Sequence, residues 1–180
     1  WIFTSATLGH DAELSWFVKR CGLEGARILR VPSPFDYAAQ AAMYVPEDFP
    51  SPSDPRHGSA VAALVANAAM SLGGRTLVLT TTLRAIAVIA QVQRQQLAQL
   101  GSSLGVLAQG GWPKLRLMER FRAGAGPQGG CILVASASFW EGFDVPGDAL
   151  QLVVIDKLPF PPPGDPLVEA RTLQIEQSGG

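Results

Sequence analysis

A loop that carries two hydroxyls and two carboxylates follows an apolar run in the last third of the chain. The run Cys131–Ala135 leads into Ser136, and the next residues include Ser138, Glu141 and Asp144. Serine hydroxyls can donate hydrogen bonds to phosphate oxygens, and paired carboxylates can do acid–base work. One carboxylate pair is weak evidence for catalysis, but loops held by a rigid sheet are where binding groups concentrate. The sequence therefore predicts a binding loop after a buried strand.

Several catalytic patterns are missing from the sequence. No Gly-x-x-x-x-Gly-Lys-Ser/Thr run is present, which excludes a phosphate-binding loop of the Walker A type. His10 and His57 are isolated in the sequence, so a metal site or a histidine-based triad has little support. Cys21 and Cys131 are far apart and match no metal-binding spacing. We therefore expect no metal site in this chain.

The composition is that of a folded domain with an apolar core. The chain has 180 residues, a hydrophobic fraction of 47% and a formal net charge of −1. This length fits one α/β domain, and the charge excludes a global basic surface for nucleic acid without excluding a local one. No apolar run approaches the roughly 20 residues that cross a bilayer, and no signal peptide is present. We expect a cytoplasmic protein of the bacterial type with no membrane partner.

Apolar patterning predicts strands that alternate with helices. Strand-like runs lie at residues 1–4, 27–31, 42–45, 76–79, 104–108, 131–135 and 152–156. Helical spacing lies at residues 11–21, 56–72, 83–100 and 114–122, and a last helix is expected after Asp165-Pro166. Asp54-Pro55 and Asp165-Pro166 each combine a capping side chain with a first-turn proline. Because the strands are continuously apolar, we expect a parallel sheet covered by helices on both faces.

Polar residues gather where the predicted strands end. These residues are Thr80, Thr81 and Thr82, then Gln109 and Gly110, then Ser136 to Asp144, and finally Asp156 and Lys157. In open parallel sheets, ligands bind beyond the carboxyl ends of the strands. Hydroxyls at a helix N-terminus form an anion site, and glycine lets another backbone approach closely. The sequence therefore predicts one binding surface assembled from four loops.

Taken together, these loops resemble the second RecA-like motor domain of superfamily 2 helicases, closest to the XPD/DinG-like branch. The resemblance spans nearly the whole chain. The matching runs are Thr4-Ser5-Ala6-Thr7-Leu8 with motif III, Ser33-Pro34-Phe35-Asp36-Tyr37 with a Ser-Pro-Phe element, Leu77–Thr82 with motif IV, Gln109-Gly110 with the Gln-Gly step after it, Phe139–Gly147 with motif V, and Lys157-Leu158-Pro159-Phe160 with Asp165-Pro166. The Phe-Trp-Glu-Gly and Lys-Leu-Pro-Phe elements are the specific ones. The implied fold is a RecA-like three-layer α/β/α domain with a mostly parallel sheet.

The resemblance implies a role for each matching residue. Ser5, Ala6 and Thr7 would couple the nucleotide state to movement between two motor domains. Glu141, Gly142 and Asp144 would face the nucleotide. The residues that would bind DNA are Thr80, Thr81, Thr82, Gln109, Gly110, Ser136, Ser138 and Lys157. No catalytic set is complete within these 180 residues.

Simpler roles stay open for the hydroxyl residues. Ser5 and Thr7 could form a turn that caps the following helix. Thr81 or Thr82 could cap the helix after the strand, and this role is compatible with anion binding. Gly111 could belong to a tight turn before Pro113.

Simpler roles stay open for the larger side chains as well. Lys157 could pair with Asp156, in a salt bridge of little energetic value. Trp140 could stack on a base, although packing beneath the loop is favoured. The basic residues of 114–122 fit a solvated helix face better than a contact with the DNA backbone.

The resemblance also implies a division of the chain. Residues 1–24 would be the end of the first motor domain with its connector, and residues 25–180 the second motor domain, ending before motif VI. Both chain ends look cut from a longer protein. The sequence contains neither the Walker motifs of the first domain nor the arginine finger of motif VI. Because such an arginine contributes orders of magnitude in rate, we expect these residues alone to hydrolyse no ATP.

The implied whole enzyme is an ATP-dependent DNA helicase that couples ATP hydrolysis to 5′-to-3′ translocation on single-stranded DNA and to unwinding. ATP and Mg²⁺ would be its cofactors, and any iron–sulfur cluster would lie upstream of this chain. Its partners would be single-stranded DNA and the first RecA-like domain. One alternative is a RecA-like module that binds nucleic acid or a partner protein without motor activity. Another is an unrelated doubly wound nucleotide-binding enzyme, disfavoured because no Gly-x-Gly-x-x-Gly follows the early strands.

Overall fold

The computed structural model describes residues 1–126, 129–161 and 164–177, and the chain divides into two compact units. The first unit is Trp1–Pro46 and the second is Glu47–Gly180. The predicted boundary after residue 24 concerns two motor domains of a longer protein, and it stays a prediction. Within the described ranges, the helices are all too short or too polar to cross a membrane.

The first unit contains two short helices, α1 (Ser15–Cys21) and α2 (Tyr37–Gln40), and most of its side chains are exposed. The Asp11 carboxylate organises the start of α1. It accepts hydrogen bonds from the backbone N–H of Ser15 at 3.0 Å and from the Ser15 hydroxyl at 2.9 Å. Gly22 ends α1 with a φ of 62°, as predicted for a helix stop.

Three predicted strands are wrong. Residues 1–4, 27–31 and 42–45 are exposed and form no strand in the structure. A β-strand requires a neighbouring strand that completes its backbone hydrogen bonds, and none of these runs has such a neighbour among the described residues. Their apolar composition alone therefore gave an incorrect secondary structure.

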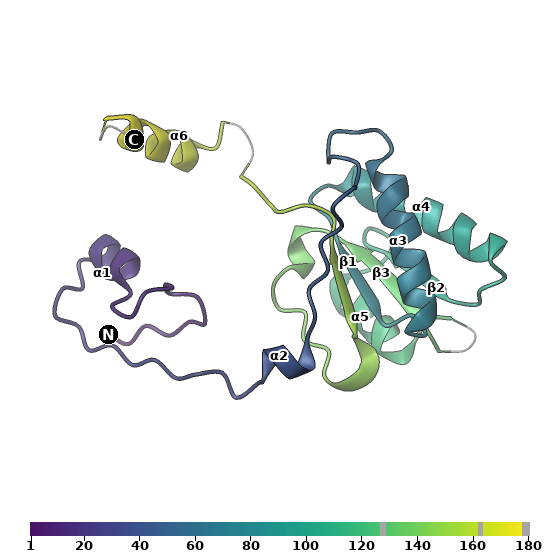
Figure 1. The fold of residues 1–180 in the computed structure, drawn as a ribbon, viewed down its shortest axis with the longest axis horizontal. Helices are drawn as coiled ribbons and strands as arrows, with labels where there is room; N and C mark the ends of the chain where they lie inside the picture. The colour runs from purple at the N-terminus through teal and green to yellow at the C-terminus, as the bar shows by residue number, and fades with distance from the viewer. Residues whose placement is uncertain (127–128, 162–163, 178–180) are drawn as a thin grey trace. The chain divides into compact units, whose positions relative to one another are not determined.

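The second unit is built on a four-stranded sheet in which every pair is parallel, as predicted (Figure 1). Its strands are β1 (Thr76–Leu79), β2 (Gly105–Ala108), β3 (Cys131–Ala135) and β4 (Leu152–Ile155), in the order β2-β3-β1-β4. Its helices are α3 (His57–Ser71), α4 (Leu83–Gln99), α5 (Lys114–Ala123) and α6 (Pro166–Gln177). Two 3₁₀ turns, η1 (Ala137–Phe139) and η2 (Gly147–Ala149), shape the loop between β3 and β4.

Alternate strand residues pack into two cores, one on each face of the sheet. Val78 and Ile132 are fully buried against side chains of α3 and α4. Leu77 and Leu133 point to the other face, where they pack with α5 and with Phe139 of η1. Burial of each such side chain contributes about 1.5–3 kcal/mol, so the sheet is a rigid base for the loops that follow its strands. This arrangement is the expected three-layer α/β/α architecture.

Strand β4 differs from the expectation of burial on both faces. It lies at one edge of the sheet, and the side chains of Val153 and Ile155 are each 48% exposed. Leu152 and Val154, which point to the opposite face, are half-buried. The sequence of β4 is as continuously apolar as that of β3, but Val153 and Ile155 belong to neither apolar core of the described residues.

The two predicted Asp-Pro caps have different outcomes. Asp165 accepts hydrogen bonds from the backbone N–H groups of Leu167 and Val168, at 2.9 and 3.1 Å, and α6 begins at the next residue as predicted. Helix α3 instead begins at His57, so Asp54 is not its cap. Asp54 accepts from the Arg56 guanidinium at 2.7 Å and from the Arg56 backbone N–H at 2.8 Å. These bonds lower the pKa of Asp54 to about 2.

Candidate nucleic-acid interface

The Gln109 side chain joins the loop after β2 to the loop after β3. Its Oε1 atom accepts hydrogen bonds from the Ser136 backbone N–H at 2.7 Å and the Ser136 hydroxyl at 3.2 Å. Its Nε2 atom donates to the Ser138 hydroxyl at 3.1 Å. Three residues predicted to bind DNA therefore form one connected group. We call the surface made by residues 80–82, 109–110, 136–144 and 156–157 the strand-end surface.

The three threonines after β1 have different environments. Thr80 is fully buried, and its hydroxyl donates to the Thr82 carbonyl at 3.2 Å. Thr82 is exposed and caps α4, because its hydroxyl accepts from the Ala85 backbone N–H at 3.2 Å. Thr81 is half-buried. The helix-capping role left open for Thr81 or Thr82 thus belongs to Thr82, and the Thr80 side chain cannot reach a ligand from its buried position.

Trp140 packs beneath the loop, as favoured from the sequence. Its ring is half-buried against the core that contains Phe139. The indole N–H donates to the Thr80 carbonyl at 3.3 Å. Trp140 therefore ties the loop after β3 to the loop after β1.

The basic residues of α5 do not all form a solvated face, contrary to the favoured interpretation. Lys114 is half-buried, and its ammonium donates to the carbonyls of Ser138 at 2.5 Å and Glu141 at 3.0 Å. The ammonium also lies 5.3 Å from the centroid of the Phe139 ring. Arg122, at the other end of α5, donates to the Asp144 carbonyl. Sequence reasoning missed this role, because an amphipathic helix pattern does not reveal which cation contacts a loop backbone.

Lys114 and Arg122 position the predicted nucleotide-binding residues. Glu141, Gly142 and Asp144 are all exposed, and Gly142 has a φ of 64° that favours glycine. The two cations bind backbone carbonyls on either side of this turn, and neither the Glu141 nor the Asp144 carboxylate forms an ion pair among the described residues. The turn can therefore present two carboxylates to a ligand from a fixed backbone.

His57, which is isolated in the sequence, has a side-chain partner at the end of β4. Its Nε2 atom lies 2.5 Å from Oδ1 of Asp156. The alternative pairing of Lys157 with Asp156 is not seen, and Lys157 is half-buried with no ion pair among the described residues. No local pattern could have found this contact, because the two residues are 99 positions apart.

Ser5 and Thr7 form a small turn in the first unit. The Ser5 hydroxyl accepts from the Thr7 backbone N–H at 3.1 Å and lies 3.4 Å from the Thr7 hydroxyl. Ser5, Ala6 and Thr7 are exposed. Their turn does not cap α1, which begins at Ser15. The coupling role of these residues stays a prediction.

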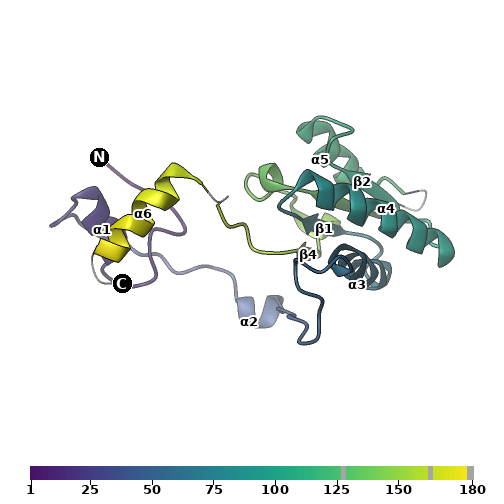
Figure 2. The same cartoon turned by 90° about the horizontal axis from the view of Figure 1, so that it is seen from above.

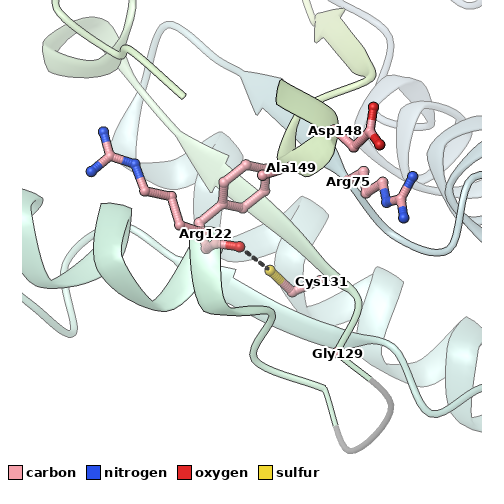
Figure 3. Close-up of a pocket in the computed structure, with 7 residues that line it drawn as sticks. Arg75, Arg122, Gly129, Cys131, Asp148 and Ala149 are labelled. Atoms are coloured by element: carbon pink, nitrogen blue, oxygen red, sulfur yellow. Dashed lines mark hydrogen bonds between the residues drawn. The ribbon is translucent and has the colours of Figure 1, made fainter. Parts of the chain in front are cut away.

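A cavity of about 250 Å³ lies near the amino ends of β1 and β3, at the other end of the strands from the strand-end surface (Figure 3). Its lining includes Arg75, Arg122 and Cys131. The two guanidinium groups extend in opposite directions in Figure 3, so they do not form one anion site. Burial raises the pKa of the Cys131 thiol, which disfavours a reactive thiolate. Among the residues that the structure describes, no three His, Cys, Asp or Glu side chains could hold a metal ion.

Comparison with known proteins shows the family to which the chain belongs. Residues 65–180 match the model of a helicase C-terminal domain. The chain belongs to this helicase family. Within the matched range lie all the residues predicted to contact DNA or nucleotide, whereas Ser5–Thr7 lie outside it.

Several curated proteins are similar to this helicase domain over its whole length. It is 40% identical to the ATP-dependent DNA helicase YoaA of Escherichia coli K12, over 100% of this chain and 27% of that protein. It is 36% identical to the ATP-dependent helicase DinG of Mycobacterium tuberculosis H37Rv, over 99% of this chain and 26% of that protein. It is 31% identical to the 3'-5' exonuclease DinG of Bacillus subtilis 168, over 99% of this chain and 19% of that protein. The chain thus spans about a quarter or less of the length of these relatives.

Proposed function

We propose that this helicase domain is the second motor domain of an ATP-dependent DNA helicase. The whole enzyme would couple ATP hydrolysis to 5′-to-3′ movement along single-stranded DNA and to unwinding, in the bacterial cytoplasm. The observation that carries this proposal is the hydrogen-bonded group of Gln109, Ser136 and Ser138, which joins two strand-end loops into one surface. Its position beyond the carboxyl ends of parallel strands is the usual place for ligands in such sheets.

The residues proposed for DNA binding have two roles: some would contact the phosphates, and others would hold the loops in place. Exposed hydroxyls and backbone N–H groups at Thr82, Gly110 and Ser138 would donate to phosphates, with Lys157 supplying positive charge. Gly110 has a φ of 111°, so a side chain there would be strained. The buried Thr80 would act by holding its loop, and it would not contact the strand directly.

The nucleotide contacts would come from the turn at Glu141, Gly142 and Asp144. ATP with its Mg²⁺ would be held mainly by the first motor domain of the longer protein, and this turn would respond to its presence. The backbone contacts from Lys114 and Arg122 support this role, because a turn that is already ordered loses little conformational entropy when it binds a ligand. Ser5, Ala6 and Thr7 would couple hydrolysis to domain movement, within residues 1–24 of the first motor domain.

The test is DNA binding by the full-length protein at several salt concentrations. We expect Ser138→Ala to weaken single-stranded DNA binding about three- to tenfold, and Lys157→Ala to weaken it and reduce the salt dependence by about one released ion. Gln95→Ala, on the exposed side of α4, is the matched control and should leave the affinity unchanged. Unchanged affinity in both Ser138→Ala and Lys157→Ala would contradict the proposal.

A second candidate is a nucleic-acid or partner-binding module without motor activity. It is favoured by one comparison, in which the relative from Bacillus subtilis is named as an exonuclease and not as a helicase. The two candidates differ in ATP hydrolysis by the full-length protein. DNA-stimulated hydrolysis that Asp144→Ala abolishes would support the motor, whereas DNA binding without any hydrolysis would support the binding module.

A further inference from the structure

A buried pair of ionisable side chains joins the first residue of α3 to the residue that follows β4. The His57 and Asp156 side chains are only 10% and 3% exposed, and 2.5 Å separates His57 Nε2 from Asp156 Oδ1. Figure 2 shows α3 and β4 beside each other, as this contact requires. The next residue along the chain is Lys157, which supplies the charge of the proposed DNA contact.

Both nitrogens of the His57 ring are occupied. The Nδ1 atom lies 2.7 Å from the Pro50 carbonyl oxygen, and it must carry hydrogen because a carbonyl can only accept. A proton must also lie between Nε2 and the Asp156 carboxylate, so ring and carboxyl hold two protons between them. No lone pair of the ring is left to bind a metal ion or to act as a base. The pair is therefore suited to holding structure and not to proton transfer with a substrate.

The surroundings hold the pair in one arrangement. The Phe49 ring meets the His57 ring edge-on at 5.6 Å between centroids. The Asp156 backbone N–H donates to the Leu79 carbonyl at 3.0 Å, which attaches the end of β4 to the end of β1. Asp156 is thus bonded through its backbone to the sheet and through its side chain to α3. These two bonds determine where the chain turns into Lys157.

We propose that His57 is a positioning residue: through Asp156 it holds Lys157 in place to meet a phosphate of single-stranded DNA. The inference rests on the proposed function and deepens it. Without His57 the Asp156 carboxylate would be buried with no partner, and the end of β4 would shift to bring it to water. Lys157 would then lose its orientation while keeping its charge.

The experiment is a double-mutant cycle on single-stranded DNA affinity, using the full-length protein with His57→Phe, Lys157→Ala and both changes together. Phenylalanine keeps the ring contact with Phe49 and removes both hydrogen bonds. We expect His57→Phe to weaken binding about three- to tenfold in the wild-type background and less than about twofold when Lys157 is already alanine. His57→Gln, which can still donate to Asp156, should recover part of the affinity. Arg56→Gln is the matched control, because this neighbouring side chain is 80% exposed and contacts Asp54 instead.

Two results would overturn the inference. One is an equal loss of affinity from His57→Phe in both backgrounds, which is the signature of general destabilisation. The other is no effect of Lys157→Ala, which removes the residue that His57 is said to position. In that second case Ser138→Ala still decides the proposed function separately, so the two failures are distinguishable. If His57→Phe folds poorly, the same comparison with His57→Leu, which also removes both hydrogen bonds, decides the question.

Discussion

The side-chain oxygen of Gln109 lies 2.7 Å from the backbone nitrogen of Ser136, so one glutamine supplies the hydrogen bond that the buried end of β3 needs. Ser136 is only 8% exposed, and a buried N–H without an acceptor is costly. The same side chain holds the Ser138 hydroxyl through its nitrogen. This glutamine, which follows a neighbouring strand, holds the loop that we propose to face DNA.

Gln109→Ala should therefore weaken both the fold and the binding of DNA. We expect a loss of about 1–3 kcal/mol in the free energy of unfolding, because the Ser136 N–H loses its acceptor. Single-stranded DNA affinity should fall severalfold. Thermal unfolding and fluorescence anisotropy check the two effects, with Gln95→Ala as the control. An unchanged melting temperature would show that this hydrogen bond is replaced or unimportant.

Lys114→Met should slow DNA-stimulated ATP hydrolysis by the full-length protein. The change keeps a long unbranched side chain but removes the ammonium that binds the carbonyls of Ser138 and Glu141. A charge-assisted hydrogen bond is stronger than a neutral one, and losing about 1.4 kcal/mol of it corresponds to about a tenfold lower rate. Arg116→Met removes a cation from the same helix at a side chain that is 61% exposed, and it should have no effect. Equal rates for the two variants would argue against the role of Lys114.

Thr82→Ala should destabilise the start of α4. The Thr82 hydroxyl accepts from the Ala85 N–H, and loss of such a cap costs about 1 kcal/mol. Thr82→Ser keeps the hydroxyl and should restore both stability and DNA affinity. Hydrogen exchange at the first turn of α4 measures the local effect. Faster exchange in Thr82→Ser than in Thr82→Ala would contradict this assignment.

Gln93→Leu should stabilise the second unit. Gln93 is fully buried, and its amide oxygen and nitrogen have no hydrogen-bond partner among the described residues. Replacing an unpaired buried amide by an apolar side chain of similar size should gain about 1 kcal/mol. Gln91→Leu, at an exposed position of the same helix, is the control for added hydrophobicity. A lower melting temperature for Gln93→Leu would mean that the amide is bonded in solution.

The carboxyl of Asp54 should titrate near pH 2. Its pKa falls from 3.8 to about 2, first because of the Arg56 side chain and then because of the Arg56 backbone N–H. Since the folded-state pKa is lowered, the contact stabilises the start of α3 above pH 3.8 and is lost as the pH falls through about 2. Arg56→Gln removes only the side-chain part, so the pKa should rise part of the way to 3.8. NMR of the Asp54 carboxyl carbon measures the titration midpoint in the wild type and in Arg56→Gln. Identical midpoints in the two proteins would contradict the assignment.

The sequence by itself determined the parallel sheet and the loops that follow its strands. Runs such as Thr76–Leu79 and Cys131–Ala135 are apolar at every position but the first threonine, and this pattern is typical of the strands of a parallel sheet covered on both faces. Because parallel strands end at the same edge, the residues after them had to be neighbours, and the motif resemblance then indicated the helicase family.

Only the tertiary structure decided which of these residues can reach a ligand and which hold the others. Thr80 and Thr82 are two positions apart, yet one is buried and the other exposed, because the chain turns from strand into helix between them. Pattern cannot distinguish the half-exposed β4 from the buried β3, since strand order depends on contacts far along the chain. The same reason hid the contact of His57 with Asp156, which unites residues 99 positions apart and exists only once α3 packs beside the sheet.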